Sequence, residues 1–173
     1  MKKILFFVSL LVAFTAAGQP AIKIFAYSQE TSPGNIPNNV TDESGKAVVT
    51  KKGVSKNYYF FAAYPPSVKV SFCEAWIGGR YYKLQATPVD STPVVMINYN
   101  IPDQPVKEVL VPASKLRVRS LSPLGSPSGK IIRANWFRKM LSQSELIISY
   151  IYKEKKYFIP VKKIKTLLPM MGI

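Results

Sequence analysis

The stretch SFCEAWIGGRYYKLQ, residues 71–85, predicts a β-hairpin, and the rest of the chain is interpreted outward from it. Gly78 and Gly79 can both take the positive φ that a primed two-residue turn requires, so they mark the turn. Counting outward from this turn places Trp76 opposite Tyr81 on the neighbouring strand. The hairpin register is therefore predicted before any other contact in the protein.

Side chains on a strand alternate between the two faces of the sheet, which divides the hairpin residues into two sets. We expect one set to face the core: Cys73, Ala75, Tyr82 and Leu84. The other face carries Glu74, Trp76, Tyr81 and Lys83. An aromatic pair flanked by charges predicts a platform for a ligand or a partner protein. The alternative is that the pair only stabilises the hairpin and that another strand or loop covers its rings.

Cys73 is the only cysteine of the chain, and the chain contains no histidine. We expect a core thiol, whose pKa burial would raise; the alternatives are an intermolecular disulfide and a catalytic or modified thiol. Ordinary serine and cysteine triads need a histidine base, and zinc and haem sites depend on histidine and cysteine. The nine acidic residues are scattered along the sequence. We therefore expect no enzymatic activity, no metal and no cofactor.

Outside the hairpin, proline and glycine separate short segments rich in Val, Ile, Tyr and Phe, a pattern typical of an antiparallel all-β domain. The predicted strands cover residues 21–27, 46–50, 58–63, 68–77, 80–86, 94–99, 106–111, 116–120, 130–134, 145–152 and 156–164. Strands at this spacing indicate a sandwich or barrel. We expect an antiparallel β-sandwich, immunoglobulin-like in general shape.

Three stretches rich in proline, serine and glycine predict loops, at residues 29–39, 87–93 and 122–129. The four-residue spacing of Trp136 with Met140, and of Phe137 with Leu141, predicts one short helix over residues 135–141. A bulged strand is the alternative for this segment.

The first 18 residues have the pattern of a signal peptide. Two lysines precede a 14-residue, mostly apolar run at positions 4–17, and small residues follow at 16–18. This run is shorter than the about 20 residues that a transmembrane helix needs. We expect cleavage after Gly18, export to the bacterial periplasm or exterior, and a mature chain without a transmembrane segment. Residues 19–173 then form a single β-rich domain, or two small β domains divided near 100–106.

The charge of the chain is strongly basic and uneven. Lysine and arginine number 24 against 9 acidic residues, and residues 106–173 hold 14 basic and 3 acidic side chains, whereas residues 19–105 hold 8 and 6. Such asymmetry predicts an anionic partner, although lysines also keep β proteins soluble and their edges unpaired. The candidate anion-binding residues are Arg117, Arg119, Lys130, Arg133, Arg138, Lys139, Lys162 and Lys163.

Three functional hypotheses follow from these patterns, of which the third, an enzyme with an unconventional site, runs against the expectation of no activity. The first is a non-catalytic binding or structural module of the cell envelope that contacts another envelope protein. The second is an electrostatic binder of anionic envelope polymers, such as lipopolysaccharide, acidic polysaccharide or lipid. We expect no nucleic-acid partner, because an exported protein meets little nucleic acid.

Overall fold

The computed structural model describes residues 19–32, 55–98, 105–128 and 134–171. Most of these residues lie in strands, and the helix that accompanies them is α2 (Asn135–Ser142). The prediction of an all-β protein with one short helix near 135–141 is therefore confirmed. Within the described residues, no helix has the length and apolar character needed to cross a bilayer.

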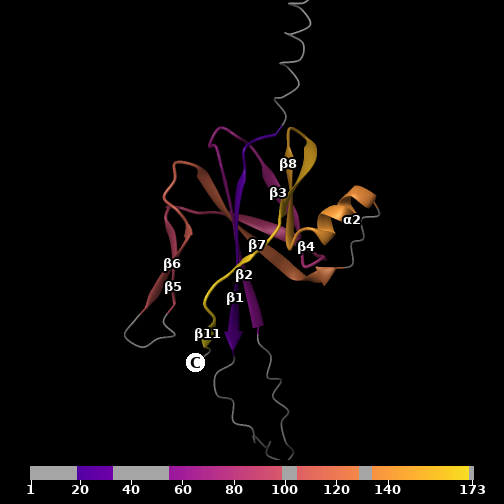
Figure 1. Ribbon diagram of the computed structural model, residues 1–173. Coiled ribbons are helices and arrows are strands. Elements are labelled where there is room, and N and C mark those ends of the chain that lie inside the picture. Colours follow the sequence, from indigo (N-terminus) through magenta and orange to yellow (C-terminus); the bar gives the residue numbers. More distant parts are fainter. Residues whose placement is uncertain (1–18, 33–54, 99–104, 129–133, 172–173) are drawn as a thin grey trace, which may run out of the picture.

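One large sheet contains most of the strands (Figure 1). Its members are β1 (Lys23–Ser32), β2 (Ser55–Tyr64), β3 (Ser71–Ile77), β4 (Arg80–Pro88), β7 (Arg117–Ser128), β8 (Leu146–Tyr152), β9 (Lys155–Val161), β10 (Lys165–Thr166) and β11 (Met170–Met171). The strand order is β10–β1–β2–β7–β4–β3–β8–β9, and β11 also pairs with β1. Only β10 and β11 run parallel to their neighbour β1 among the described pairings.

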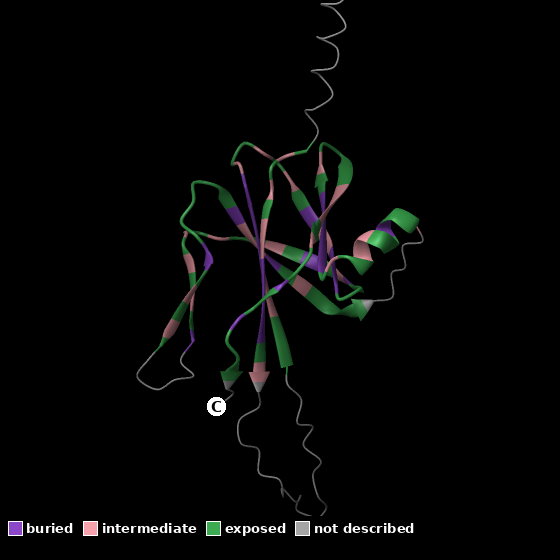
Figure 2. Cartoon of the chain, in the orientation of Figure 1, coloured by how far each residue is buried: buried purple, intermediate pink, exposed green. Residues whose placement is uncertain are grey.

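The sheet curls, because the short segment 162–164 leads from β9 at one edge to β10 at the other. The N–H of Leu167 donates to the carbonyl oxygen of Ser28 at 2.8 Å, and the N–H of Ile164 donates to the Glu145 carboxylate at 2.7 Å. One apolar cluster accordingly contains Phe60 from β2 together with Ile148 from β8. Figure 2 shows buried stretches along several of the strands that cross near the centre of the view.

A second, two-stranded sheet is formed by β5 (Val94–Asn98) and β6 (Val106–Val111). Its inner side packs on the large sheet, where Leu110 and Val111 join a buried cluster with Tyr27 of β1. The hydroxyl of Tyr27 donates to the carbonyl oxygen of Leu110 at 2.6 Å. The sub-boundary predicted near 100–106 falls mostly on residues outside the described part of the chain.

The predicted loop at 122–129 is wrong, because β7 continues to Ser128 and pairs with β4 along this stretch. Strand β2 pairs with β7 only as far as Leu121, so among the described strands the remainder of β7 pairs with β4 alone. Proline is tolerated at such an edge, where its missing N–H is not needed. The strand predicted at 46–50, and most of the one predicted at 130–134, lie outside the described residues.

Candidate functional site

The predicted hairpin register is confirmed. In the β3–β4 hairpin Trp76 pairs with Tyr81, Ala75 with Tyr82 and Glu74 with Lys83. Ala75 and Leu84 are buried in the main core, as their assigned face requires.

The opposite face of this hairpin is also buried, so the predicted platform of Glu74, Trp76, Tyr81 and Lys83 is not an open aromatic surface. The side chain of Trp76 is 1% exposed and that of Tyr81 8%. Helix α2 covers them, because Phe137 places its ring centroid 4.8 Å from that of Trp76. The prediction that the Trp76 and Tyr81 rings are accessible to a ligand is therefore wrong, and the alternative, that another segment covers them, is confirmed.

The carboxylate of Glu74, a third member of this predicted platform, contacts side chains from three other strands. It accepts hydrogen bonds from the Tyr81 hydroxyl at 3.1 Å and from the Ser149 hydroxyl at 3.2 Å. It also forms an ion pair with Lys156. These contacts connect β3 with β4, β8 and β9, so the Glu74 side chain stabilises the pairing of four strands.

Cys73 is half-exposed and does not lie in the core, which corrects the expectation from strict alternation. The register between β3 and β8 shifts between Phe72 and Glu74, so Cys73 is the extra residue of a bulge. Phe72 therefore takes the core position that alternation assigns to Cys73. Partial burial raises the pKa of the Cys73 thiol, Lys156 lowers it and Glu74 raises it further.

The eight predicted anion-binding residues come from separate parts of the fold. Lys130 and Arg133 lie outside the described residues. The others are Arg117 and Arg119 on β7, Arg138 and Lys139 on α2, and Lys162 and Lys163 after β9. These six residues therefore lie on three different parts of the fold. Arg117 and Arg119 are the pair that lines a common hollow.

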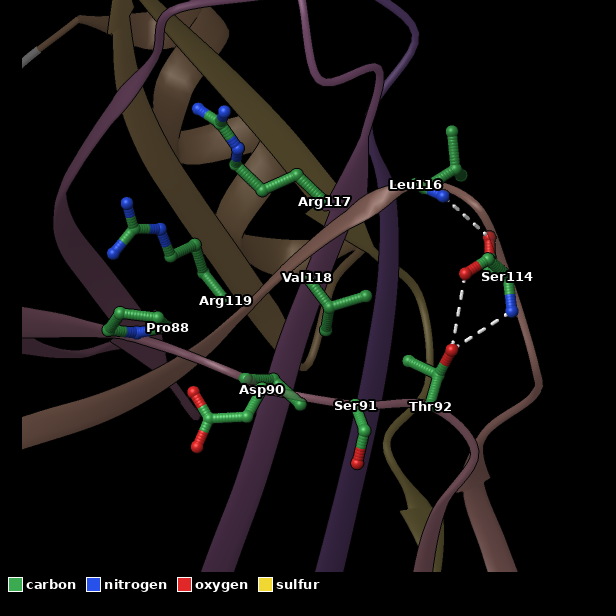
Figure 3. Close-up of a pocket in the computed structure, with 10 residues that line it drawn as sticks. Pro88, Asp90, Ser91, Thr92, Ser114, Leu116, Arg117, Val118 and Arg119 are labelled. Atoms are coloured by element: carbon green, nitrogen blue, oxygen red, sulfur yellow. Dashed lines mark hydrogen bonds between the residues drawn. The ribbon is translucent and has the colours of Figure 1, made fainter.

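This hollow, which we call the arginine hollow, has a volume of about 310 Å³ and lies between the start of β7 and the segment after β4. Its polar lining consists of Arg117, Arg119, Asp90, Ser91, Thr92 and Ser114. Arg117 and Arg119 are two positions apart on one strand, so their side chains share a face. Figure 3 shows both guanidinium groups extending to the same side of β7.

The rim of the arginine hollow is fixed by hydrogen bonds between segments distant in sequence. The Thr92 hydroxyl donates to the Ser114 carbonyl oxygen at 3.2 Å and accepts from the Ser114 N–H at 3.0 Å. The N–H of Val89 donates to the carbonyl oxygen of Val118 at 3.1 Å. These bonds join the loop at 89–93 to the turn before β7 and to β7 itself.

The arrangement suits a small anionic group. A guanidinium offers a planar fork of donors that matches carboxylate, sulfate and phosphate oxygens. Within the described residues neither Arg117 nor Arg119 forms an ion pair, and Asp90 is the one acidic side chain in the lining. The arginine hollow therefore carries a net positive charge with guanidinium donors available to a ligand.

Sequence reasoning identified the two arginines and missed the hydroxyl groups. Ser91 and Thr92 lie in the segment predicted as a loop at 87–93, and nothing in the local pattern connects that segment with Ser114. Comparison of the chain with models of known protein families, with curated proteins and with solved structures finds no match. The site is therefore interpreted from its own geometry.

Proposed function

We propose that the mature chain is an exported, non-catalytic binding module of the bacterial cell envelope that holds anionic groups of an envelope glycan. The supporting observation is the arginine hollow, which is lined by Arg117 and Arg119 together with hydroxyl-bearing residues, and in which neither arginine has an ion-pair partner among the described residues. Carboxylate and phosphate groups recur along acidic polysaccharide and lipopolysaccharide. A hollow of about 310 Å³ accommodates one such group with part of its sugar.

The basic C-terminal part of the chain supports the same proposal at longer range. Residues 106–173 hold 14 basic and 3 acidic side chains, so their summed field attracts a polyanion before it reaches the arginine hollow. Binding in the hollow would then select the group, while the surrounding lysines would contribute attraction that salt screens. Export through residues 1–18 and a position peripheral to the envelope belong to this proposal.

The finer description of the fold is retained as part of the proposal. In a curled sheet, β1 and β2 contribute to the same core as β3 and β8. Two sheet portions around one core are compatible with the immunoglobulin-like sandwich that the sequence predicts.

The test is binding of the mature protein to alginate, a polymer of carboxylated sugars, with neutral dextran as the reference polymer. Each charge-assisted hydrogen bond is worth about 1.5–3 kcal/mol, so Arg117→Gln with Arg119→Gln should weaken alginate binding by at least about tenfold. The matched control is Lys115→Gln, because Lys115 is an exposed neighbour that does not line the hollow. Equal binding by the double variant and the control would refute the proposal.

A second candidate, contact with an envelope protein, is supported by the outer side of the β5–β6 sheet. Val95 and Val109 face each other across these strands and are 42% and 53% exposed, with Ile97 beside them at 38%. Exposed apolar side chains on one sheet face are typical of a protein contact. Val95→Lys with Val109→Lys should abolish crosslinking to that protein, and the contact of the unaltered chain should survive high salt.

A further inference from the structure

Arg119 borders two hollows, of which the arginine hollow is one. The other has a volume of about 320 Å³, and we call it the tyrosine hollow. Besides Arg119, its lining consists of Tyr64 from β2, Val70, Ser71 and Phe72 where β3 begins, and Ala86 near the end of β4. The two hollows therefore meet at Arg119.

The tyrosine hollow lies where β3 and β4 cease to pair with each other. Among the described residues, the pairing of these two strands ends at Glu74 with Lys83. Beyond this point β4 continues beside β7, whereas the start of β3 pairs with β8 as far as Ser71. The divergence of the two strands leaves space between Ser71 and Ala86, which both line the hollow.

The side chain of Arg119 lies on the face of β7 that leads to the tyrosine hollow. Leu121, two positions further along β7, is buried in the main core, and alternation puts Arg119 on the same face. Tyr64 and Phe72 belong to this same core cluster. In Figure 3 the guanidinium group of Arg119 and the side chain of Thr92 extend to different sides of β7. A group bound by Arg119 is therefore adjacent to both hollows.

The polar groups of the tyrosine hollow are available to a ligand. Tyr64 is 2% exposed, yet its hydroxyl forms no hydrogen bond with a described residue. Arg119 is half-buried and forms neither a hydrogen bond nor an ion pair within the same part of the chain. Polar groups with so little exposure normally have a partner, so these two donors point to a bound group.

Apolar side chains complete the tyrosine hollow, from Val70, Phe72 and Ala86. A sugar ring has hydroxyl groups at its edge and C–H groups on its faces, so a few donors among apolar side chains suit it. Each hollow is near the lower end of the about 300–1,000 Å³ that small-molecule sites occupy. A ligand that uses both hollows must therefore extend past Arg119.

We propose that the two hollows are neighbouring subsites for one acidic oligosaccharide, in which Arg119 binds a carboxylate at the junction and the tyrosine hollow holds the adjacent sugar unit. This inference rests on the function proposed above, and it narrows the ligand from an anionic group to a chain of at least two sugar units. The second unit binds while the first is already held, so it adds affinity without a second loss of translational freedom.

The experiment measures binding of the mature protein to defined alginate fragments, from the monosaccharide mannuronate to the hexasaccharide, by calorimetry. The affinity should rise at least about tenfold from mannuronate to the length that fills both hollows, and then level off. One fixed, high salt concentration is used throughout, because it screens the long-range attraction of the basic surface, which would otherwise also grow with chain length.

Variants separate the tyrosine hollow from the rest of the surface. Ser71→Trp places an indole in this hollow and should lower the hexasaccharide affinity to near that of mannuronate. The matched control is Ser55→Trp, because Ser55 is the exposed first residue of β2, as Ser71 is of β3, and lines neither hollow. Tyr64→Phe removes only the hydroxyl and should lower the hexasaccharide affinity about three- to tenfold. Circular dichroism checks that each variant is folded.

The outcomes distinguish failure of this inference from failure of the proposed function. Binding of mannuronate that needs Arg117 and Arg119 but does not strengthen with chain length would overturn the inference and leave the proposed function intact. A gain with length that Ser71→Trp preserves as fully as Ser55→Trp would also overturn it, because the second unit would then bind elsewhere. Absence of binding at every length would overturn both.

Discussion

Phe137 stands edge-on to Trp76, with ring centroids 4.8 Å apart and ring planes at 69°. Phe137 is the buried residue of α2, and Trp76 lies at the centre of the sheet face that α2 covers. This contact determines which hairpin face is closed to solvent, and it leaves Trp136 as the exposed tryptophan.

We predict that Phe137→Ala lowers the free energy of unfolding by about 3–5 kcal/mol, because it removes a fully buried ring and leaves a cavity over Trp76. Trp136→Ala, one position away, removes a side chain that is 56% exposed and should cost about 1 kcal/mol or less. Urea unfolding followed by circular dichroism measures both. Similar losses for the two variants would show that α2 is not held by Phe137.

We predict that Cys73 reacts with iodoacetamide more slowly than a free cysteine peptide at neutral pH. Partial burial raises the pKa of this thiol, and only the thiolate reacts, so the midpoint of the pH–rate profile should lie above that of the peptide. Lys156 opposes this increase. Lys156→Ala should therefore move the midpoint further upward and slow the reaction at neutral pH several-fold.

The matched control for this prediction is Lys155→Ala. Lys155 precedes Lys156 on β9 and points to the other side of the strand, so its removal should leave the pH–rate midpoint of Cys73 in place. A midpoint that falls in Lys156→Ala, or that moves equally in both variants, would contradict the assigned electrostatic cause.

Local rules were sufficient for the β3–β4 hairpin and for α2. Two adjacent glycines set the turn, the turn sets the register, and the four-residue spacing of Trp136 with Met140 marks a helix. The bulge at Cys73 could not be predicted from these rules, because it arises in the pairing of β3 with β8. These strands are distant in sequence: Glu74 of β3 and its partner Ser149 of β8 are 75 residues apart. An alternation pattern contains no information about the register with a distant strand.

The candidate site was predictable only in part for the same reason. Arg117 and Arg119 alternate with Val118 along a strand, so their common face follows from the sequence. The presence of Thr92 in the same hollow depends on its hydrogen bond with Ser114, which lies 22 residues further along the chain. The burial of Trp76 likewise depends on Phe137 of α2, and the sequence of β3 alone does not predict that contact.

We predict that Asp90→Asn strengthens alginate binding by about two- to fivefold. Asp90 lines the arginine hollow with its carboxylate, which repels an incoming anion and offsets part of the charge of Arg117 and Arg119. Glu30→Gln is the control, because Glu30 is exposed on β1 and does not line the hollow. Weaker binding by Asp90→Asn, measured by calorimetry at one salt concentration, would show that Asp90 orders the site instead of opposing the ligand.

We predict that the backbone conformation of the turn between β8 and β9 lowers the stability of the protein, and that substitutions in this turn can raise it. Lys153 and Glu154 occupy this turn with φ of 48° and 63°, whereas the equivalent turn between β3 and β4 has Gly78 at 53° and Gly79 at 78°. Residues with a Cβ pay about 1–2 kcal/mol in the left-handed region, and asparagine followed by glycine suits a primed turn best. Lys153→Asn with Glu154→Gly should therefore raise the free energy of unfolding by about 1 kcal/mol, after allowance for the entropy of glycine in the unfolded chain.

This double substitution removes one positive and one negative charge, so the net charge is unchanged and urea unfolding at one pH isolates the backbone effect. Gly79→Val is the converse variant: a Cβ at Gly79 would meet no atom within 4 Å, so the expected loss of about 1–2 kcal/mol comes from its φ alone. If the asparagine–glycine variant were less stable than the unaltered protein, the side chains of Lys153 and Glu154 would have to contribute more than their backbone conformation costs.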